Sequence, residues 1–237
     1  MSEQAVKRTP IFELAQRQGA SFAEVDGWLV VERFGDDRPV TPGESAPLAL
    51  VDCSARAKVL VEGASAASVI ERAWQVSAPA INRGQRLPEG VVCCLRQDRY
   101  FLSGPPGAGR QFMATVEAAA QEDDGLLTVT GVTHGRAELW LLGNEARELL
   151  SRLCGLDLHP QIFPDLTARE TSMAKTKQLL IRADLGGQPA YALVGARSLG
   201  AYLWQTVVAA GHDMDLQLRG EAWLRRLAAT REGHEGG

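Results

Sequence analysis

The chain has 237 residues, of which 45% are hydrophobic and 23% charged, so it can bury a substantial core as one large domain or two small ones. Its formal net charge is −4 and its lysines and arginines are scattered, which argues against nucleic acid or an anionic membrane as the main partner. No apolar run approaches the roughly 20 residues of a membrane span, and the opening "MSEQAVKRTP" has no apolar signal core.

The cysteines and histidines show no metal-ligand or disulfide pattern. No Cys-x-x-Cys pair occurs among the four cysteines, and Cys93 and Cys94 are neighbours in the apolar run "VVCCL". Neighbours in a strand point to opposite faces, which favours buried thiols over a bridge between them. The four histidines lack ligand spacing as well. These features indicate a reduced, cytoplasmic protein without a metal.

The first elements can be predicted from local signals. Thr9 followed by Pro10 marks a helix start and Gly19 a stop, which predicts a short helix over residues 11–18. The segment "WLVVERF", residues 28–34, predicts a strand, and the turn-rich residues 36–45 predict a loop.

An internal repeat organises the middle of the chain. "KVLVEGASAASVIERA" from Lys58 and "ELWLLGNEARELLSRL" from Glu138 share one plan, a strand, a glycine turn and a helix. Gly63 corresponds to Gly143, an offset of 143 − 63 = 80. Apolar residues on both helices recur at spacings of three and four, so each helix has one inward face. Ser65 and Asn144 are the predicted N-caps.

A second pair of matching segments supports a duplication. "YFLSG" (residues 100–104) and "YALVG" (residues 191–195) are predicted strand ends, and each leads into a helix with corresponding apolar positions. We therefore predict two related α+β halves, residues 1–125 and 126–229. The tail begins as a helix at "RGEAWLRRL", and residues 230–237 are expected to be disordered.

The residues alone do not form a catalytic constellation. "SGPPGAGR", residues 103–110, is either an anion-binding loop before a helix or a simple turn, and its mismatch to known phosphate motifs favours the turn. His134 lies in a predicted turn, where a lone histidine is usually structural. Three tryptophans are candidates for an exposed apolar patch, although a place in the core or at its rim is favoured: Trp74, Trp140 and Trp223.

Two segments of the N-terminal half resemble the aminomethyltransferase, or glycine-cleavage T-protein, family. Residues 9–28, "TPIFELAQRQGASFAEVDGW", are similar to the family's opening "TPLxxLHxxxGAxFxxFxGW". Residues 50–63, "LVDCSARAKVLVEG", fall where the family has "LxDxSHxGKxxVxG". The matching positions are Asp52, Ser54, Lys58, Val61 and Gly63.

The C-terminal half is similar to a shortened member of the same superfamily, the gamma subunit of heterotetrameric sarcosine oxidase. The similar segments are residues 154–164 ("CGLDLHPQIFP"), 167–182 and 197–204. The resemblance implies an α+β fold with duplicated strand–helix–strand halves of the aminomethyltransferase folate-binding type, without the C-terminal barrel domain.

Departures from the family patterns bear on activity. The family's "GGxxDDL" corresponds to "LPEGVVCCL", residues 87–95, in which Glu89 is the only acid. The family's "TGEDGFEL", whose glutamate binds the pterin, corresponds to "LGGQPAYAL", with Ala192 in the glutamate's place. Ala55 replaces the "SH" histidine. An alanine methyl cannot accept the hydrogen bonds that a carboxylate accepts, so the resemblance carries over no catalytic residue.

Two main hypotheses follow from the resemblance. The first is a non-catalytic subunit of a sarcosine oxidase-type complex, packed against flavin-containing subunits that oxidatively demethylate N-methyl amines. The second is a tetrahydrofolate-dependent aminomethyltransferase or one-carbon transferase with an altered site, for which the cofactor-binding candidates are Asp52, Glu89, Tyr100 and Tyr191. A stand-alone folate-binding relative comes last, because the motif "KGCYxGQE" of that branch is missing.

Overall fold

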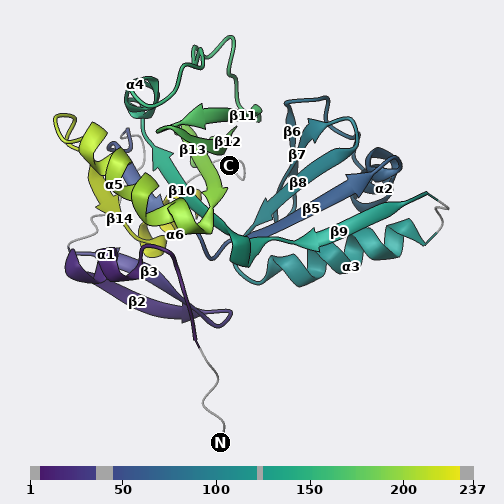
Figure 1. Ribbon diagram of the computed structural model, residues 1–237, viewed down its shortest axis with the longest axis horizontal. Helices are drawn as coiled ribbons and strands as arrows, with labels where there is room; N and C mark the ends of the chain where they lie inside the picture. Colours follow the sequence, from purple (N-terminus) through teal and green to yellow (C-terminus); the bar gives the residue numbers. More distant parts are fainter. Residues whose placement is uncertain (1–5, 36–44, 122–124, 230–237) are drawn as a thin grey trace, which may run out of the picture.

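The computed structural model describes residues 6–35, 45–121 and 125–229 of the chain, which form three β-sheets and six α-helices (Figure 1). The three-stranded sheet, in the order β1-β3-β2, is built near the N-terminus. Its strands are β1 (Lys7–Arg8), β2 (Ala20–Val25) and β3 (Trp28–Phe34). The strand predicted over residues 28–34 is confirmed, and the helix predicted over residues 11–18 is α1 (Phe12–Arg17). Of the loop predicted over residues 36–45, all but Ser45 lie outside the described residues.

The first repeat forms a five-stranded antiparallel sheet in the order β6-β7-β8-β5-β9. Its strands are β5 (Ala57–Gly63), β6 (Gly84–Leu87), β7 (Gly90–Arg96), β8 (Arg99–Gly104) and β9 (Leu127–Gly131). Helices α2 (Ala66–Trp74) and α3 (Ala108–Ala120) cover one face of this sheet. Every second residue of a strand points to the same face, and the apolar side of each helix packs on these residues.

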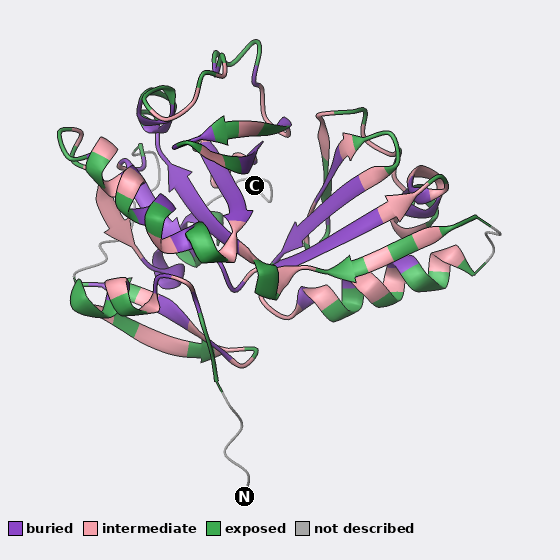
Figure 2. Ribbon diagram, in the orientation of Figure 1, coloured by how far each residue is buried: buried purple, intermediate pink, exposed green. Residues whose placement is uncertain are grey.

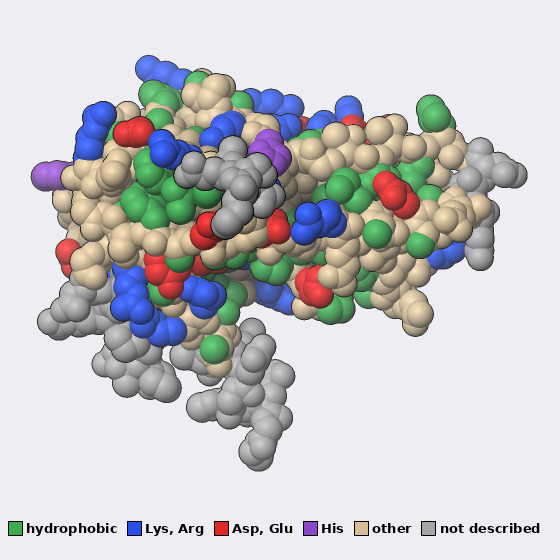
Figure 3. Space-filling view, turned by 90° about the horizontal axis from the view of Figure 1, so that it is seen from below, with side chains coloured by type: hydrophobic (Ala, Val, Ile, Leu, Met, Phe, Trp, Pro, Cys, Tyr) green, Lys and Arg blue, Asp and Glu red, His purple; other side chains and the backbone are tan. Residues whose placement is uncertain are grey.

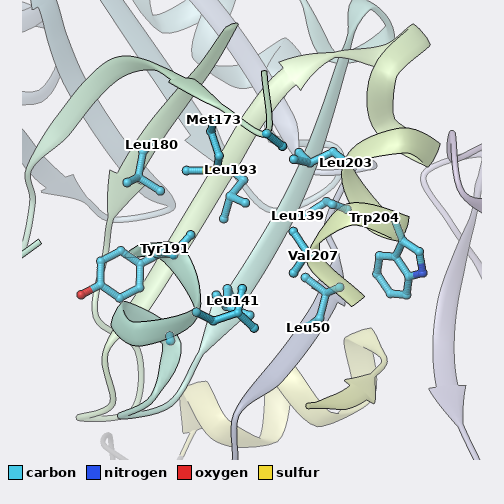
Figure 4. Close-up of a cluster of buried hydrophobic side chains, with 14 of the residues drawn as sticks. Leu50, Leu139, Leu141, Met173, Leu180, Tyr191, Leu193, Leu203, Trp204 and Val207 are labelled. Atoms are coloured by element: carbon cyan, nitrogen blue, oxygen red, sulfur yellow. The ribbon is translucent and has the colours of Figure 1, made fainter. Parts of the chain in front are cut away.

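The second repeat forms a six-stranded sheet in the order β11-β12-β13-β10-β4-β14. Its strands are β4 (Ala49–Asp52), β10 (Arg136–Leu142), β11 (Ala168–Met173), β12 (Thr176–Arg182), β13 (Ala190–Ala196) and β14 (Gln217–Arg219). Helices α4 (Ala146–Ser151) and α5 (Gly200–Ala210) pack on one face of it together with α1. Figure 4 shows part of this core, where Leu139, Leu193 and Trp204 come from neighbouring elements.

The two sheets confirm the duplicated fold and show how its halves are joined. Strands β5 and β8 pair as β10 and β13 do, and β7 and β6 extend one sheet as β12 and β11 extend the other. The strand that precedes each repeat pairs with the opposite repeat: β4 runs into β5 but pairs with β10, and β9 precedes β10 but pairs with β5. If the chain is divided at residue 125, as the sequence predicts, each part contributes one strand to the other's sheet.

The uncovered faces of the two large sheets meet in an apolar layer, closed at one end by α6 (Glu221–Ala229). Central strands are buried, whereas the outer faces of the helices are exposed (Figure 2). We call this layer the inter-sheet cluster. Its buried members include Val51, Leu60, Cys93, Phe101, Leu142, Ile181, Ala192, Val194 and Trp223.

Some local expectations were wrong or lie beyond the described residues. Ser65 precedes α2 as predicted but makes no side-chain cap bond, and α4 is preceded by Glu145 rather than Asn144, whose side chain donates to Ser45 instead. The favoured place of the tryptophans in the core or at its rim is confirmed, because Trp140 and Trp223 are only 7% and 1% exposed and Trp74 is partly buried against the core under α2 and α3. The predicted tail over residues 230–237 is outside the described residues.

Candidate functional site

A fully buried ion pair joins the two repeats. Lys58 on β5 and Glu138 on β10 lie 3.3 Å apart between Nζ and Oε2, and both side chains are 0% exposed. Lys58 Nζ also donates to the backbone oxygens of Ser54 (3.1 Å) and Arg56 (2.8 Å). Burial lowers the pKa of Lys58, and the Glu138 carboxylate opposes that effect. The pair therefore stabilises the junction only because each charge is fully coordinated.

Glu138 is the centre of a wider polar network. Its carboxylate accepts hydrogen bonds from the Trp140 indole (2.6 Å) and the Ser103 hydroxyl (3.3 Å). The Arg56 Nε lies 3.4 Å from the same carboxylate. The Glu138 backbone N–H donates to Ser54 Oγ (3.1 Å). One acid thus ties together β10, β8 and the loop between β4 and β5.

The pair occupies equivalent positions of the duplication, since 138 − 58 = 80 is the offset of the glycine turns. The two residues open the two repeat segments, and each lies between two apolar neighbours in its strand. Sequence reasoning aligned these segments and missed the pair. The sequence did contain a signal for this pair: a lysine and a glutamate stand at equivalent positions inside the two repeated strands. Charged residues are rarely buried unless they are paired, so these two could have been expected to meet.

Asp52 lies next to this network at the end of β4. It is 2% exposed, and its Oδ1 accepts the backbone N–H of Ser54 (3.0 Å). Burial raises the pKa of the Asp52 carboxyl, with hydrogen bonds from Ser54 opposing the rise. Three positions kept from the family pattern, Asp52, Ser54 and Lys58, thus support one loop and the ion pair it encloses.

The other candidate cofactor residues lie apart from Asp52 and from each other. Glu89 is exposed in the turn between β6 and β7. Tyr100 is buried beside Cys94 on the α2/α3 side of its sheet, and Tyr191 is buried in the core below α4 and α5. Burial raises the pKa of both phenols. None of the four candidates lines the pockets described below.

Two positions where the family pattern carries acids, now Cys93 and Ala192, face the inter-sheet cluster. Letter by letter, "EGVVCCL" places Cys93 and Cys94 at the two aspartates of "GGxxDDL". Cys93 and Ala192 are both buried in the inter-sheet cluster, whereas Cys94 points to the opposite face of β7. Burial raises the pKa of the Cys93 thiol to about 12, so it stays protonated at neutral pH.

The cavity between the large sheets is small. It measures about 30 Å³ and is lined by Leu60, Leu95 and Phe101 on one side and by Gln178, Leu179 and Val194 on the other, with charged residues at its edge. A volume of about 30 Å³ is roughly a tenth of the lower end of the 300–1,000 Å³ that is typical of ligand sites. This cavity is therefore far smaller than a typical ligand site.

A second pocket, of about 280 Å³, opens where the glycine-rich loop enters α3. Gly107 precedes the helix with φ +90°, and Lys7, Arg110 and His134 are among the lining residues. The cations there already have partners: Arg110 lies 3.5 Å from Asp26, and the Lys7 ammonium lies 5.7 Å from the Trp28 ring centroid. The preferred interpretation of this loop as a strand-to-helix turn agrees with its geometry.

Sequence reasoning missed a third pocket, of about 290 Å³, against the first turn of α6. Arg56 and Glu221 line it with Trp140 and mostly apolar neighbours. Glu221 is 8% exposed. A glutamate in the first turn of a helix is common on the surface, so the sequence did not distinguish it.

The described residues contain no cluster of three or more metal-binding side chains and no helix long and apolar enough to cross a membrane. The four cysteines are free thiols. On the face in Figure 3, acidic and basic side chains are interspersed among hydrophobic and other atoms.

Two curated relatives show what the sequence is similar to. An aminomethyltransferase of Halothermothrix orenii is 23% identical over 225 residues, covering 89% of this chain and 61% of the relative. A sarcosine oxidase subunit alpha of Rhizobium meliloti is 24% identical over 256 residues, covering 98% of this chain and 26% of the relative. The chain thus spans about three fifths of one relative and a quarter of the other.

Solved structures share the fold. The glycine cleavage system aminomethyltransferase T from Bartonella henselae aligns with a TM-score of 0.74 at 20% identity, over 93% of this chain and 62% of the other. A chain of heterotetrameric sarcosine oxidase from Corynebacterium sp. U-96 aligns with a TM-score of 0.65 at 20% identity, over 87% of this chain and 95% of the other. The model of the GCVT N-terminal domain matches residues 11–229. The chain belongs to the GCVT N-terminal domain family.

Proposed function

We propose that this chain is a non-catalytic, aminomethyltransferase-like subunit of a hetero-oligomeric complex of the sarcosine oxidase type. In this proposal, flavin-containing partner subunits oxidatively demethylate an N-methyl amine that is linked to tetrahydrofolate one-carbon metabolism. The chain itself contributes a folded surface and no reacting group. Its free thiols support a reducing, cytoplasmic location for the complex.

The observation that carries the proposal is the state of the inter-sheet cluster. Cys93 and Ala192 stand where the family patterns have acids, and both are buried among apolar side chains. A protonated thiol and a methyl group cannot exchange a proton with an amine at neutral pH, as acid–base catalysis requires. The neighbouring cavity of about 30 Å³ is also far below the roughly 300 Å³ at which typical ligand sites begin.

The kept motif residues support the same conclusion, because they have structural partners. Asp52 and Ser54 shape the loop that coordinates Lys58, and Lys58 is neutralised by Glu138. The alignment that covers 95% of a sarcosine oxidase chain adds that a chain of comparable length with this fold occurs in such an assembly.

One observation favours the alternative, a folate-dependent aminomethyltransferase or one-carbon transferase with an altered site. Burial raises the pKa of the Asp52 carboxyl, as in many catalytic acids. In that alternative, Asp52, Glu89, Tyr100 and Tyr191 bind the cofactor. Their separation in the structure makes this the second candidate.

Calorimetric titration with 5-formyltetrahydrofolate, a stable analogue of the reduced cofactor, tests the proposal. We expect no saturable heat at ligand concentrations that saturate a catalytically active aminomethyltransferase in the same buffer. Binding tighter than about 100 μM, roughly −5.5 kcal/mol, contradicts the proposal and supports the alternative. A second test isolates the native protein under mild conditions, where we expect flavin absorbance to co-elute with it.

A further inference from the structure

The pocket against α6 combines apolar walls with two opposite charges. It measures about 290 Å³, near the lower end of the 300–1,000 Å³ that is typical of ligand sites, so it suits a small molecule. The lining residues come from β2, the loop between β4 and β5, the loop before α3, β10, the loop before β13 and α6. They are Val25, Arg56, Pro105, Pro106, Trp140, Leu185, Glu221, Leu224, Arg225 and Ala228.

Glu221 is the anomaly in this pocket. It is 8% exposed, yet it makes no hydrogen bond or ion pair with any described residue. Buried carboxylates are almost always paired, because an uncompensated charge in an apolar setting costs several kcal/mol. Burial also raises the pKa of Glu221, while Arg56 and Arg225 act to lower it. A cation that enters the pocket removes this cost.

Arg56 presents the complementary charge in the same pocket. Its guanidinium lies over the Trp140 ring at 5.0 Å and its Nε is 3.4 Å from Glu138. Glu138 already neutralises Lys58, so one carboxylate faces two cations. The terminal nitrogens of Arg56 make no hydrogen bond with the described residues, and no ion pair joins Arg56 to Glu221.

The second arginine of the pocket is already neutralised. Arg225 Nη2 lies 2.7 and 2.9 Å from the two carboxylate oxygens of Glu32. The charges that remain without an ion-pair partner inside the pocket are therefore the Glu221 carboxylate and the terminal nitrogens of Arg56. Aromatic and aliphatic side chains form most of the other walls.

We propose that this pocket binds a small zwitterionic amino acid. The ligand's ammonium group pairs with Glu221, its carboxylate bridges to the guanidinium of Arg56, and its hydrocarbon part packs on Trp140 and the prolines. The proposal is independent of the proposed function, since neither Cys93 nor Ala192 lines this pocket.

Binding is tested on the full chain by saturation-transfer NMR and tryptophan fluorescence with glycine, L-alanine, L-valine and L-proline. We expect at least one of them to bind with a Kd at or below about 5 mM. For L-proline the matched single-charge probes are pyrrolidine and cyclopentanecarboxylate. If L-proline binds, each should bind at least about tenfold weaker, because each leaves one charge unpaired. Absence of binding by all four amino acids, or equal binding of a bound L-proline and pyrrolidine, overturns the proposal.

Glu221→Gln separates a binding role from a structural one. We expect it to weaken the tightest amino acid at least about tenfold and to raise the thermal midpoint by about 2–4 °C, because an uncompensated charge is removed. Glu148→Gln, an exposed change on α4, should alter neither quantity. Unchanged ligand affinity in Glu221→Gln contradicts the assignment, and so does a lowered midpoint without loss of affinity.

Discussion

Glu138 carries one negative charge between two cations in a place that solvent does not reach. Lys58 is fully buried beside it and Arg56 is 17% exposed, so the carboxylate is the sole acid within ion-pair distance of either among the described residues. Removing one member of such a group leaves the others uncompensated in a low-dielectric interior. Loss of a partner is therefore expected to cost much more than the net contribution of the intact pair.

Glu138→Gln tests this asymmetry. We expect a loss of about 3–5 kcal/mol in the free energy of unfolding, because Lys58 and Arg56 lose the carboxylate that compensates for their burial. Urea denaturation followed by tryptophan fluorescence measures it. The double variant Lys58→Met with Glu138→Leu should recover most of the loss, because the fully buried charge of Lys58 is then removed too and only the 17% exposed Arg56 lacks its partner. A Glu138→Gln protein as stable as the wild type contradicts this account.

Thiol reactivity tests the surroundings of Cys93. With its pKa near 12, Cys93 should not react with a disulfide reagent at pH 8 in the folded protein, since the thiolate is the reacting form. Cys154 is partly exposed and should react first. Mass spectrometry of the labelled peptides distinguishes them, and all four thiols should react in guanidinium chloride. Rapid labelling of Cys93 in native buffer contradicts the burial of this thiol in the inter-sheet cluster.

At the scale of elements, the same glycine turn ends β5 and β10. Gly63 has φ +149° and Gly143 has φ +104°, values that only glycine adopts readily. A Cβ at Gly63 would collide with the Leu126 carbonyl, and one at Gly143 would lie 2.6 Å from the Pro47 carbonyl oxygen. Each turn is therefore fixed both by its dihedral angles and by a neighbouring backbone.

Gly63→Ala should destabilise the protein by about 2 kcal/mol or more through dihedral strain and the collision with Leu126. Gly135→Ala is the matched control, because a Cβ there meets nothing within 4 Å and its φ is not positive. We expect the control to stay within about 0.5 kcal/mol of the wild type. Equal chemical denaturation midpoints for the two variants would falsify the assignment of strain to the Gly63 turn.

Signals confined to one element predicted that element well. The strand over residues 28–34, the glycine turns and the helix start near Pro10 follow from periodicity and turn chemistry. Pairing between strands 80 or more residues apart leaves no such local trace, so the partners of β4 and the Lys58–Glu138 pair were not predicted. The family resemblance suggested the candidates Asp52, Glu89, Tyr100 and Tyr191. Their positions in the sequence could not show that the four side chains lie far from one another in space.

At the scale of the molecule, the exchange of β4 and β9 makes the two halves interdependent. Without β10, strand β4 has one partner left, β14, which also belongs to the second half. Without β9, the five-stranded sheet loses its edge strand, and β5 has no partner on that side. The two repeats have a similar arrangement of strands and helices, but backbone hydrogen bonds between them join the repeats into one folding unit.

A cut between Asp124 and Gly125 tests this dependence. We expect neither fragment, residues 1–124 or 125–237, to unfold cooperatively alone, and an equimolar mixture to regain a cooperative transition. Circular dichroism during thermal unfolding follows both. Cooperative unfolding of either isolated fragment shows that the halves are autonomous domains.

The exchanged strands also set an order of events during synthesis. Lys58 leaves the ribosome with its own half, but its counter-charge lies 138 − 58 = 80 residues later. At about 5–20 residues per second, that interval is roughly 4–16 s. For that time the nascent first half has a lysine that it cannot bury and a strand, β4, that it cannot pair. A pause in translation between these codons prolongs exposure of an unpaired strand edge, so codon usage there becomes a determinant of folding yield.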